Sequence, residues 1–291
     1  MAEYDKGLSI IILNYHSDED TIELANSVSD LPYETIVVDS SSTINKEKFN
    51  NKSIQYFDLG ENLGYAGGNN YGIQNSRADN NSILILNPDV RIENEDIREC
   101  FRFLKSESIG LLTPRIVDEK GQQRYDLNTY PLPTLRTLGL LPSFKSTINK
   151  FTPTDYVVGC AIFINDELIE DIGLMNEDFF MYHEEVEYSI RARKAGYDIG
   201  VYTEAKATHR ESEKIHQHPY QAYYDTRNKI HMKRVIGKGS AILYVALLIP
   251  LLSKRLFRSL VFNRELIMPL ILSIFDGVRG QKGKKEQYHN N

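Results

Sequence analysis

The chain has 291 residues, of which 41% are hydrophobic and 25% charged, and a formal net charge of −6. It is long enough to bury a full α/β core, and its composition excludes the disordered, collagen-like and disulfide-rich classes. Cys100 and Cys160 are too few for a disulfide framework, and the first ten residues lack the basic start and apolar run of a signal peptide. A reducing cytoplasm is therefore the expected compartment.

The charge is unevenly distributed along the chain. Residues 229–291 contain 12 Lys and Arg but 3 Asp and Glu, whereas residues 1–228 contain 22 basic and 37 acidic residues. The acidic body argues against nucleic acid as a partner. The basic tail is also apolar, which is typical of contact with an anionic membrane surface.

Short apolar runs alternate with amphipathic patterns in the first part of the chain. The expected buried strands are Leu8–Tyr15, Thr35–Asp39, Ser53–Leu59 and Ser82–Leu86, and the expected helices include Ser17–Ser29 and Asn94–Lys105. This alternation predicts an α/β fold with a doubly wound, mostly parallel sheet flanked by helices. Ligands bind such sheets beyond the carboxyl ends of the strands, where Asn14, Asp39 and Asp89 lie.

The pattern becomes less regular after about residue 110. Residues 126–154 contain four prolines and indicate a long loop. Tyr156–Ile164 is predicted to be a strand, and Gly159 within it is typical of close approach by a ligand or another backbone. Met181–Ala195 is predicted to be a helix, because acidic residues open it and Gly196 follows it. A polar strand and His209 come next.

Two apolar blocks lie in the basic tail, at Ala241–Leu252 and Ile267–Phe275. Each is shorter than the roughly 20 residues of a spanning helix, and each contains a proline. We expect two interfacial helices on a membrane surface. The alternative is a helical cap, packed on the preceding domain or on a second subunit.

Polar residues at the strand ends have two plausible roles each. Asp39 can accept a hydrogen bond from a nucleobase or cap the next segment. Asp89, in Asn87-Pro88-Asp89, can bind Mg²⁺ or Mn²⁺ together with substrate phosphates, or belong to a plain turn. The Gly- and Asn-rich residues 62–70 can admit a diphosphate, although they match neither nucleotide-binding glycine motif.

Acidic and histidine side chains in the second half are further candidates. Glu184, Glu185 and Glu187 crowd one helix start, where mutual repulsion raises at least one pKa and favours a base; a solvated acidic helix end is the alternative. His209 is either a structural residue or a ligand.

Seven stretches carry a family resemblance, in the order SIIILNY (9–15), VVDSSS (37–42), ENLGYAGGNNYG (61–72), LILNPDV (84–90), VVGCAIFI (157–164), IGLMNEDFFMYHEEVEYSIRARKAG (172–196) and ATHRES (207–212). Together they resemble a family-two glycosyltransferase of the GT-A fold, in its bacterial rhamnosyltransferase-like branch. The resemblance covers roughly residues 8–212.

The resemblance implies roles for the donor side of the site. Asn14 and Asp39 would hold the base of a nucleotide donor, and Asn62 and Gly64 would line its ribose and diphosphate. Asn87 would occupy the first acidic position of the family's metal motif.

The remaining implied roles are the metal ligands, the base and the acceptor side. Asp89 and His209 would bind Mg²⁺ or Mn²⁺, and Glu185 would be the catalytic base, where the family usually has Asp. The acceptor side would include Gly159, Glu184 and Glu187. Arg227, in an Arg-Asn pair, would contact the diphosphate.

The implied organisation is a GT-A catalytic domain at residues 1–228, with a donor half at about 1–115 and an acceptor half at about 116–228. The tail at 229–291 would bind the inner face of the cell membrane or form a homodimer. The implied activity is inverting, metal-dependent sugar transfer to a lipid-linked polysaccharide intermediate, from dTDP-L-rhamnose in preference to a UDP-sugar.

Two hypotheses of other classes compete with this activity. Glutamate in place of the usual aspartate favours a non-catalytic sugar-nucleotide-binding subunit. A nucleotidyltransferase is disfavoured, because it needs a basic glycine-rich loop after the first strand and residues 14–20 are acidic.

Overall fold

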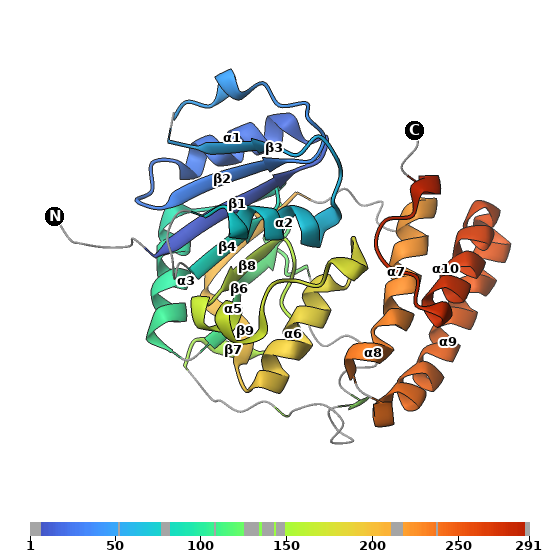
Figure 1. The fold of residues 1–291 in the computed structure, drawn as a ribbon. Coiled ribbons are helices and arrows are strands. Elements are labelled where there is room, and N and C mark those ends of the chain that lie inside the picture. The colour runs from blue at the N-terminus through green and yellow to red at the C-terminus, as the bar shows by residue number, and fades with distance from the viewer. Residues whose placement is uncertain are drawn as a thin grey trace.

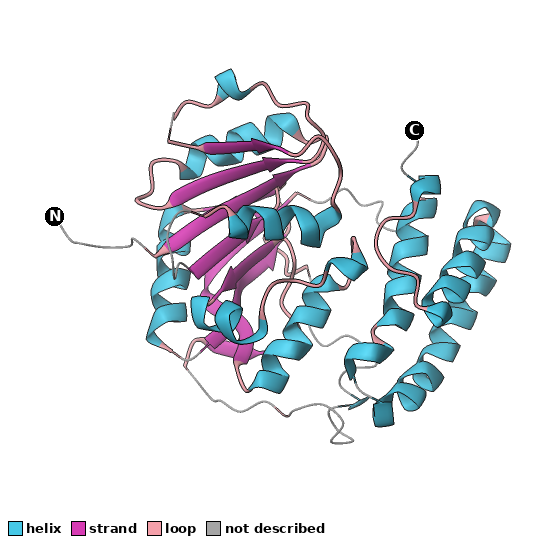
Figure 2. Cartoon of the chain, in the orientation of Figure 1, coloured by secondary structure: helices cyan, strands magenta, loops and turns pink. Residues whose placement is uncertain are grey.

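A mixed β-sheet forms the centre of the molecule, with helices on both faces (Figure 1; Figure 2). The computed structural model describes residues 7–288 apart from 52, 77–81, 108, 125–133, 136–142, 144–148, 211–217 and 237. Most of the loop expected at 126–154 lies outside these described residues, as do the last two residues of ATHRES.

The strands lie in the order β3-β2-β1-β4-β8-β6-β9-β5, and β7 pairs with β9. Their bounds are β1 Leu8–Asn14, β2 Glu34–Asp39, β3 Gln55–Asp58, β4 Ser82–Leu86, β5 Val90–Ile92, β6 Ile109–Val117, β7 Phe151–Pro153, β8 Ala161–Ile164 and β9 Asp198–His209. The helices are α1 Asp18–Val28, α2 Gly64–Gln74, α3 Asn94–Ser106, α5 Asp166–Ile172, α6 Glu184–Ala195, α7 Pro219–His231, α8 Lys233–Ile236, α9 Lys238–Phe262 and α10 Ile267–Arg279.

Side chains of β1 alternate between two cores, one on each face of the sheet. Ile10 and Ile12 pack in a cluster that contains residues of α1 and α3. Ile11 packs in a second cluster with residues of α2, α5 and α6. Because successive strand side chains point to opposite faces, a continuous run of isoleucines is buried on both. The expected doubly wound α/β architecture is confirmed, with β3, β2, β1 and β4 all parallel.

The C-terminal helices pack on the rest of the chain. Figure 1 shows α7, α9 and α10 grouped beside α6. Their shared core joins Val186 and Ile190 of α6 to Ile230 of α7 and to Tyr244 and Leu248 of α9. Residue 228 lies inside α7, so a helix crosses the expected domain boundary. None of the described helices combines the length and apolar content that a membrane crossing requires.

Two predicted elements begin later than expected. The strand at 156–164 starts only at Ala161, because side chains engage the preceding backbone: Ser189 accepts the Val157 N–H at 3.2 Å, and Tyr65 donates to the Gly159 carbonyl. The helix expected from Met181 starts at Glu184, because the backbone before it is left-handed at several residues.

Two further elements differ from the sequence expectation. Strand β6 lies inside the sheet where the pattern is irregular, since Pro114 shifts the register in its middle. Helix α9 continues through Pro250 as one helix of 25 residues, whereas we expected the proline to interrupt the apolar block.

Candidate active site

Two buried polar side chains, Asn14 and Asp39, lie side by side at the carboxyl ends of β1 and β2. The Asn14 amide donates to Asp39 Oδ1 at 2.9 Å. Asp39 also accepts hydrogen bonds from the backbone N–H groups of residues 41–44 and from the Tyr56 hydroxyl. Burial raises the pKa of Asp39, but the hydrogen bonds from Ile44, Asn14 and Ser41 outweigh it and lower the pKa to about 2.

This arrangement corrects the expectation that Asn14 and Asp39 contact a nucleobase directly. Both residues have no exposed surface. The Asn14 oxygen accepts from Ser17 and Thr21, while both Asp39 oxygens accept from the chain itself. The pair instead fixes the loop after β2, where Ser42 and Thr43 are exposed.

The predicted metal ligands Asp89 and His209 do come together. Val90 pairs with His209 in the antiparallel ladder of β5 and β9, which brings Asp89 Oδ2 within 3.1 Å of His209 Nε2. The Asp89 side chain is 39% exposed, whereas that of His209 is 8% exposed. Among the described residues there is no group of three or more His, Cys, Asp and Glu side chains that could hold a metal ion.

A cavity of about 230 Å³ lies beside Asp89. Its wall includes Asn62, Gly64 and Asn87, together with Tyr65. Gly64 begins α2 with a φ of +76°, and a Cβ there would lie 2.2 Å from the carbonyl oxygen of Phe180. Glycine is therefore required, and the N-terminal end of α2, the positive end of the helix dipole, lies beside the cavity.

The expected base Glu185 lies near Tyr65, which lines this cavity. A Cβ on Gly159 would be 3.5 Å from the Tyr65 hydroxyl and 3.9 Å from Glu185 Cγ, so these residues form one neighbourhood. Burial raises the pKa of Glu185, an effect that the nearby His183 partly offsets. A carboxylate with a raised pKa is the stronger base near neutral pH.

The neighbouring carboxylates of α6 differ in role. Glu184 is 4% exposed, and its Oε2 has no hydrogen-bond partner among the described residues. Burial and the charge of Glu185 raise the pKa of Glu184. Both oxygens of Glu187 accept from Arg191 Nε, at 2.8 and 3.0 Å, so this carboxylate is held against its own helix, and its expected acceptor-side role stays a prediction.

Arg227 is also placed differently from the expectation. It is fully buried and donates to the carbonyls of Phe179, at 2.8 Å, and Gly283, at 2.6 Å. The aromatic rings of Tyr223 and Tyr224 lie within 6 Å of its guanidinium. The structure therefore gives Arg227 a role in holding backbone, and leaves no surface of it for a diphosphate.

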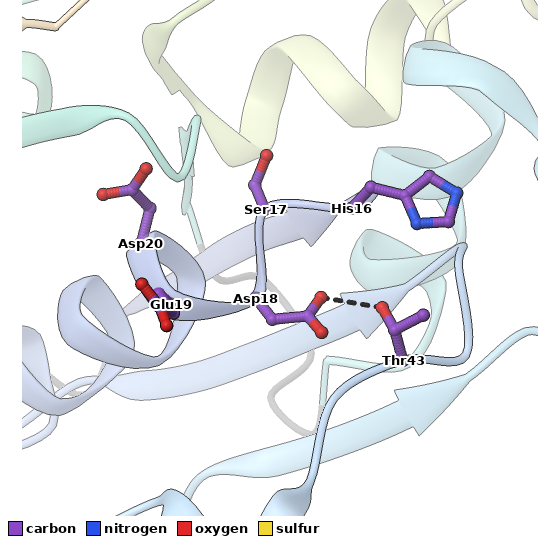
Figure 3. Close-up of a pocket in the computed structure, with 6 residues that line it drawn as sticks. All are labelled: His16, Ser17, Asp18, Glu19, Asp20 and Thr43. Carbon is purple, nitrogen blue, oxygen red and sulfur yellow. Dashed lines mark hydrogen bonds between the residues drawn. The ribbon is translucent and has the colours of Figure 1, made fainter.

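A second, larger cavity of about 460 Å³ lies on the outer side of the Asn14–Asp39 pair. Figure 3 shows its lining, which consists of residues 16–20 and Thr43. Asp18 accepts a hydrogen bond from Thr43 at 2.7 Å, and Glu19 and Asp20 add two more carboxylates. This acidic wall repels phosphate, so a diphosphate fits the smaller cavity beside Asp89 better.

Sequence reasoning did not single out Tyr65 and Met181, which line the smaller cavity. Tyr65 lies within the motif ENLGYAGGNNYG and Met181 within the long motif at 172–196. Their membership of these motifs was the available signal. Which side chains of a motif face a cavity depends on the backbone turn, and the left-handed residues before α6 could not be read from composition.

The chain is similar in sequence to known glycosyltransferases. The family model described as "Glycosyl transferase family 2" matches residues 9–173. The low-salt glycan biosynthesis hexosyltransferase Agl10 of Haloferax volcanii is 35% identical, with 96% of this chain and 94% of Agl10 covered. The dTDP-rhamnosyl transferase RfbF of Shigella flexneri is 24% identical, with 85% and 87% covered.

Solved structures share the fold at low sequence identity. S. aureus TarS 1-349, in complex with UDP-GlcNAc, has a TM-score of 0.61 and 17% identity, with 94% of this chain and 81% of TarS covered. The mannosyltransferase PcManGT from Pyrobaculum calidifontis, in complex with GDP-Man and Mn²⁺, has a TM-score of 0.56 and 13% identity, with 95% and 88% covered.

The Asp39 network generates a test of stability. We expect Asp39→Asn to lower the free energy of unfolding by about 2 kcal/mol at pH 7 in urea denaturation, because an amide loses acceptors that buried N–H groups need. Because folding lowers the pKa of Asp39, its carboxylate stabilises the fold at pH values above the ordinary pKa of an aspartate. This contribution is lost as the pH falls from about 4 toward 2. The difference from wild type should shrink over that range.

The exposed Asp30→Asn change is the charge-matched control and should leave stability unchanged. A constant difference between wild type and Asp39→Asn from pH 7 to pH 2 would contradict the role given to the Asp39 carboxylate.

Proposed function

Because the chain belongs to glycosyl transferase family 2, we propose that it moves a hexosyl group from a nucleoside diphosphate sugar to a lipid-linked glycan, with Glu185 as the base. The observation that carries this proposal is the shared neighbourhood of Glu185, Gly159, Tyr65 and the cavity beside Asp89. It provides a base with a raised pKa next to an N-terminal helix end that favours a diphosphate.

We place the donor with its diphosphate between the N-terminus of α2 and Asp89. The nucleobase then lies against the loop after β2, which Asp39 holds. dTDP-L-rhamnose is our first donor, since two relatives carry rhamnosyl transferase names. A UDP-sugar is the second, because TarS was solved with UDP-GlcNAc.

Glu185 would remove the proton from an acceptor hydroxyl, whose oxygen attacks the anomeric carbon while the bond to the diphosphate breaks. A single displacement of this kind inverts the configuration. The acceptor oxygen gains the sugar, the proton goes to Glu185, and the diphosphate leaves with the bonding electrons. Burial disfavours the charged form of both Glu184 and Glu185, which favours proton uptake at this pair.

The described part of the chain offers few side-chain ligands for a divalent ion, and this fits an ion that is shared with the substrate. Asp89, with His209 and the amide of Asn87, would hold Mg²⁺ or Mn²⁺, and substrate phosphate oxygens would supply the remaining ligands. Such an ion neutralises charge on the leaving diphosphate. The exposed carboxylate of Asp89 is accessible for this purpose.

The first experiment asks which donor binds and whether binding needs metal. We expect the thermal midpoint to rise with dTDP- or UDP-sugars, and to rise more when Mn²⁺ is added than with either component alone. Asp89→Asn should abolish the Mn²⁺-dependent part, whereas the exposed Asp30→Asn should behave as wild type. Equal shifts with Mn²⁺ and with EDTA would contradict metal-assisted donor binding.

The second experiment tests the base. Glu185→Gln should lower the transfer rate by at least about 100-fold with donor affinity unchanged, because general base catalysis contributes 10²–10⁴-fold. Glu170→Gln, on the exposed face of α5, is the matched control. Donor binding without turnover in both wild type and Glu185→Gln would favour the non-catalytic sugar-nucleotide-binding subunit instead.

We also propose that the C-terminal helices rest on an anionic membrane surface, which brings the site to a lipid-linked acceptor at the inner face of the cell membrane. Helices α9 and α10 expose many large apolar side chains, among them Phe257, Leu260, Val261, Phe262, Met268, Ile271, Phe275 and Val278. Exposed cations lie among them, namely Lys254, Arg258, Arg264 and Arg279. Apolar surface fringed with cations suits an anionic interface.

Vesicle co-sedimentation tests this surface. Arg258→Ala with Arg264→Ala should weaken binding to vesicles containing anionic lipid roughly 30-fold, since each cation contributes about 1 kcal/mol. Phe257→Ser with Phe262→Ser should weaken binding to neutral and anionic vesicles alike. Lys46→Ala with Lys48→Ala, exposed cations far along the chain, is the control. If both tail variants bind vesicles as the wild type does, membrane contact is contradicted. If the wild type is a dimer that only the phenylalanine variant converts to a monomer, the surface contacts a second copy of the chain.

A further inference from the structure

The backbone before α6 is held in an unfavourable conformation. Phe180, Tyr182 and His183 have φ values of 63°, 67° and 71°, in the left-handed region that residues with a Cβ rarely adopt. These residues directly precede Glu184 and Glu185, so their conformation sets where α6 begins and where its first carboxylates point. Such strain persists only where surrounding contacts fix it.

One side chain supplies most of those contacts. The Asn228 Nδ2 of α7 lies 2.8, 2.7 and 2.8 Å from the carbonyl oxygens of Phe179, Met181 and Tyr182, so its two hydrogens are shared among three acceptors. Asn228 is fully buried, and its oxygen accepts from Arg227 Nε at 2.9 Å. A single buried amide thus engages three carbonyls of the strained segment, and we call these contacts the Asn228 clamp.

The C-terminal end of the chain completes the clamp. Arg227 donates to both Phe179 and Gly283, and the Gly283 N–H donates to the Asp178 carbonyl at 2.8 Å. Lys282 pairs with the Asp178 carboxylate at 2.6 Å. The segment after α10 therefore lies against the turn that leads into α6.

The N-terminal end of α2 holds the opposite side of the strained segment. The Tyr65 N–H donates to the Phe180 carbonyl at 2.7 Å, and Gly64 allows that carbonyl to approach. The carbonyls of residues 179–182 therefore accept hydrogen bonds from two sides. Tyr65, at the start of α2, donates from one side, and Arg227 and Asn228 of α7 donate from the other.

We propose that Asn228 is a positioning residue, which places Glu185 for proton removal by fixing the left-handed turn Phe180–His183. This inference rests on the proposed role of Glu185 as the base. Asn228 itself lines neither cavity, and the turn it holds reaches the smaller cavity only through Met181, so we expect the larger effect on the chemical step, which depends on the position of Glu185.

The test compares Asn228→Asp, which replaces the donating amide with a carboxylate, with Asn165→Asp. Asn165 is buried and donates to the Ile109 carbonyl at 3.1 Å, but it lies at the start of α5 and does not contact the turn. Asn228→Ser, which keeps one donor and adds no charge, is a milder second variant should Asn228→Asp fail to fold.

Two readouts are measured on the full chain with Mn²⁺. The first is hydrogen exchange of the peptide spanning residues 178–186. The second is kcat and KM for release of nucleoside diphosphate, with water as acceptor, from whichever dTDP- or UDP-sugar gives the largest thermal shift.

We expect faster exchange at 178–186 and a kcat at least 30-fold lower in Asn228→Asp, with KM for the donor within about threefold of wild type. Asn228→Ser should be intermediate, and Asn165→Asp should lose stability without either change. Unchanged exchange, faster exchange with wild-type kcat, or a loss confined to KM would overturn the proposal. Absence of turnover in wild type with every donor would instead count against the proposed function, and exchange alone would then decide whether the clamp exists.

Discussion

The carbonyl of Phe180 joins the start of α2 to the turn that leads into α6. It accepts the Tyr65 N–H at the beginning of α2, and it can approach only because residue 64 has no Cβ. A buried carbonyl must be paired, so this bond fixes the start of α2 and the turn before α6 relative to each other. The neighbourhood of Tyr65, Gly159 and Glu185 depends on that constraint.

The carboxylates of the site differ in pKa because their surroundings differ. Asp39 is buried among N–H donors, and its pKa is lowered to about 2. Glu184 is buried and Glu185 half-buried, both with fewer donors, and burial raises the pKa of each. Asp39 therefore remains an anion that organises a loop, whereas Glu185 is suited to taking up a proton.

Much of the fold could be predicted from the sequence, because buried parallel strands are continuous apolar runs and β1, β2 and β4 are of this kind. Strand β6 was missed, since Pro114 and Arg115 break its apolar pattern. The meeting of Asp89 and His209 was anticipated through motifs. The burial of Arg227 was not, because a cation is enclosed only when carbonyls and aromatic rings from distant segments satisfy it.

The C-terminal helices have a second consequence for how an acceptor meets the base. Arg255 of α9 pairs with Asp225 of α7, which in turn is 2.8 Å from His183 Nε2. Asp225 is only 6% exposed; burial raises its pKa, but Lys229, His183 and Arg255 outweigh this and hold the pKa well below the ordinary value. Removing one member of such a buried network leaves an uncompensated charge, so the network resists rearrangement. A helix with an exposed apolar face is thus tied through one ion pair and one hydrogen bond to the residue next to Glu184. The orientation of that face relative to Glu184 and Glu185 is therefore set by buried contacts rather than by a linker.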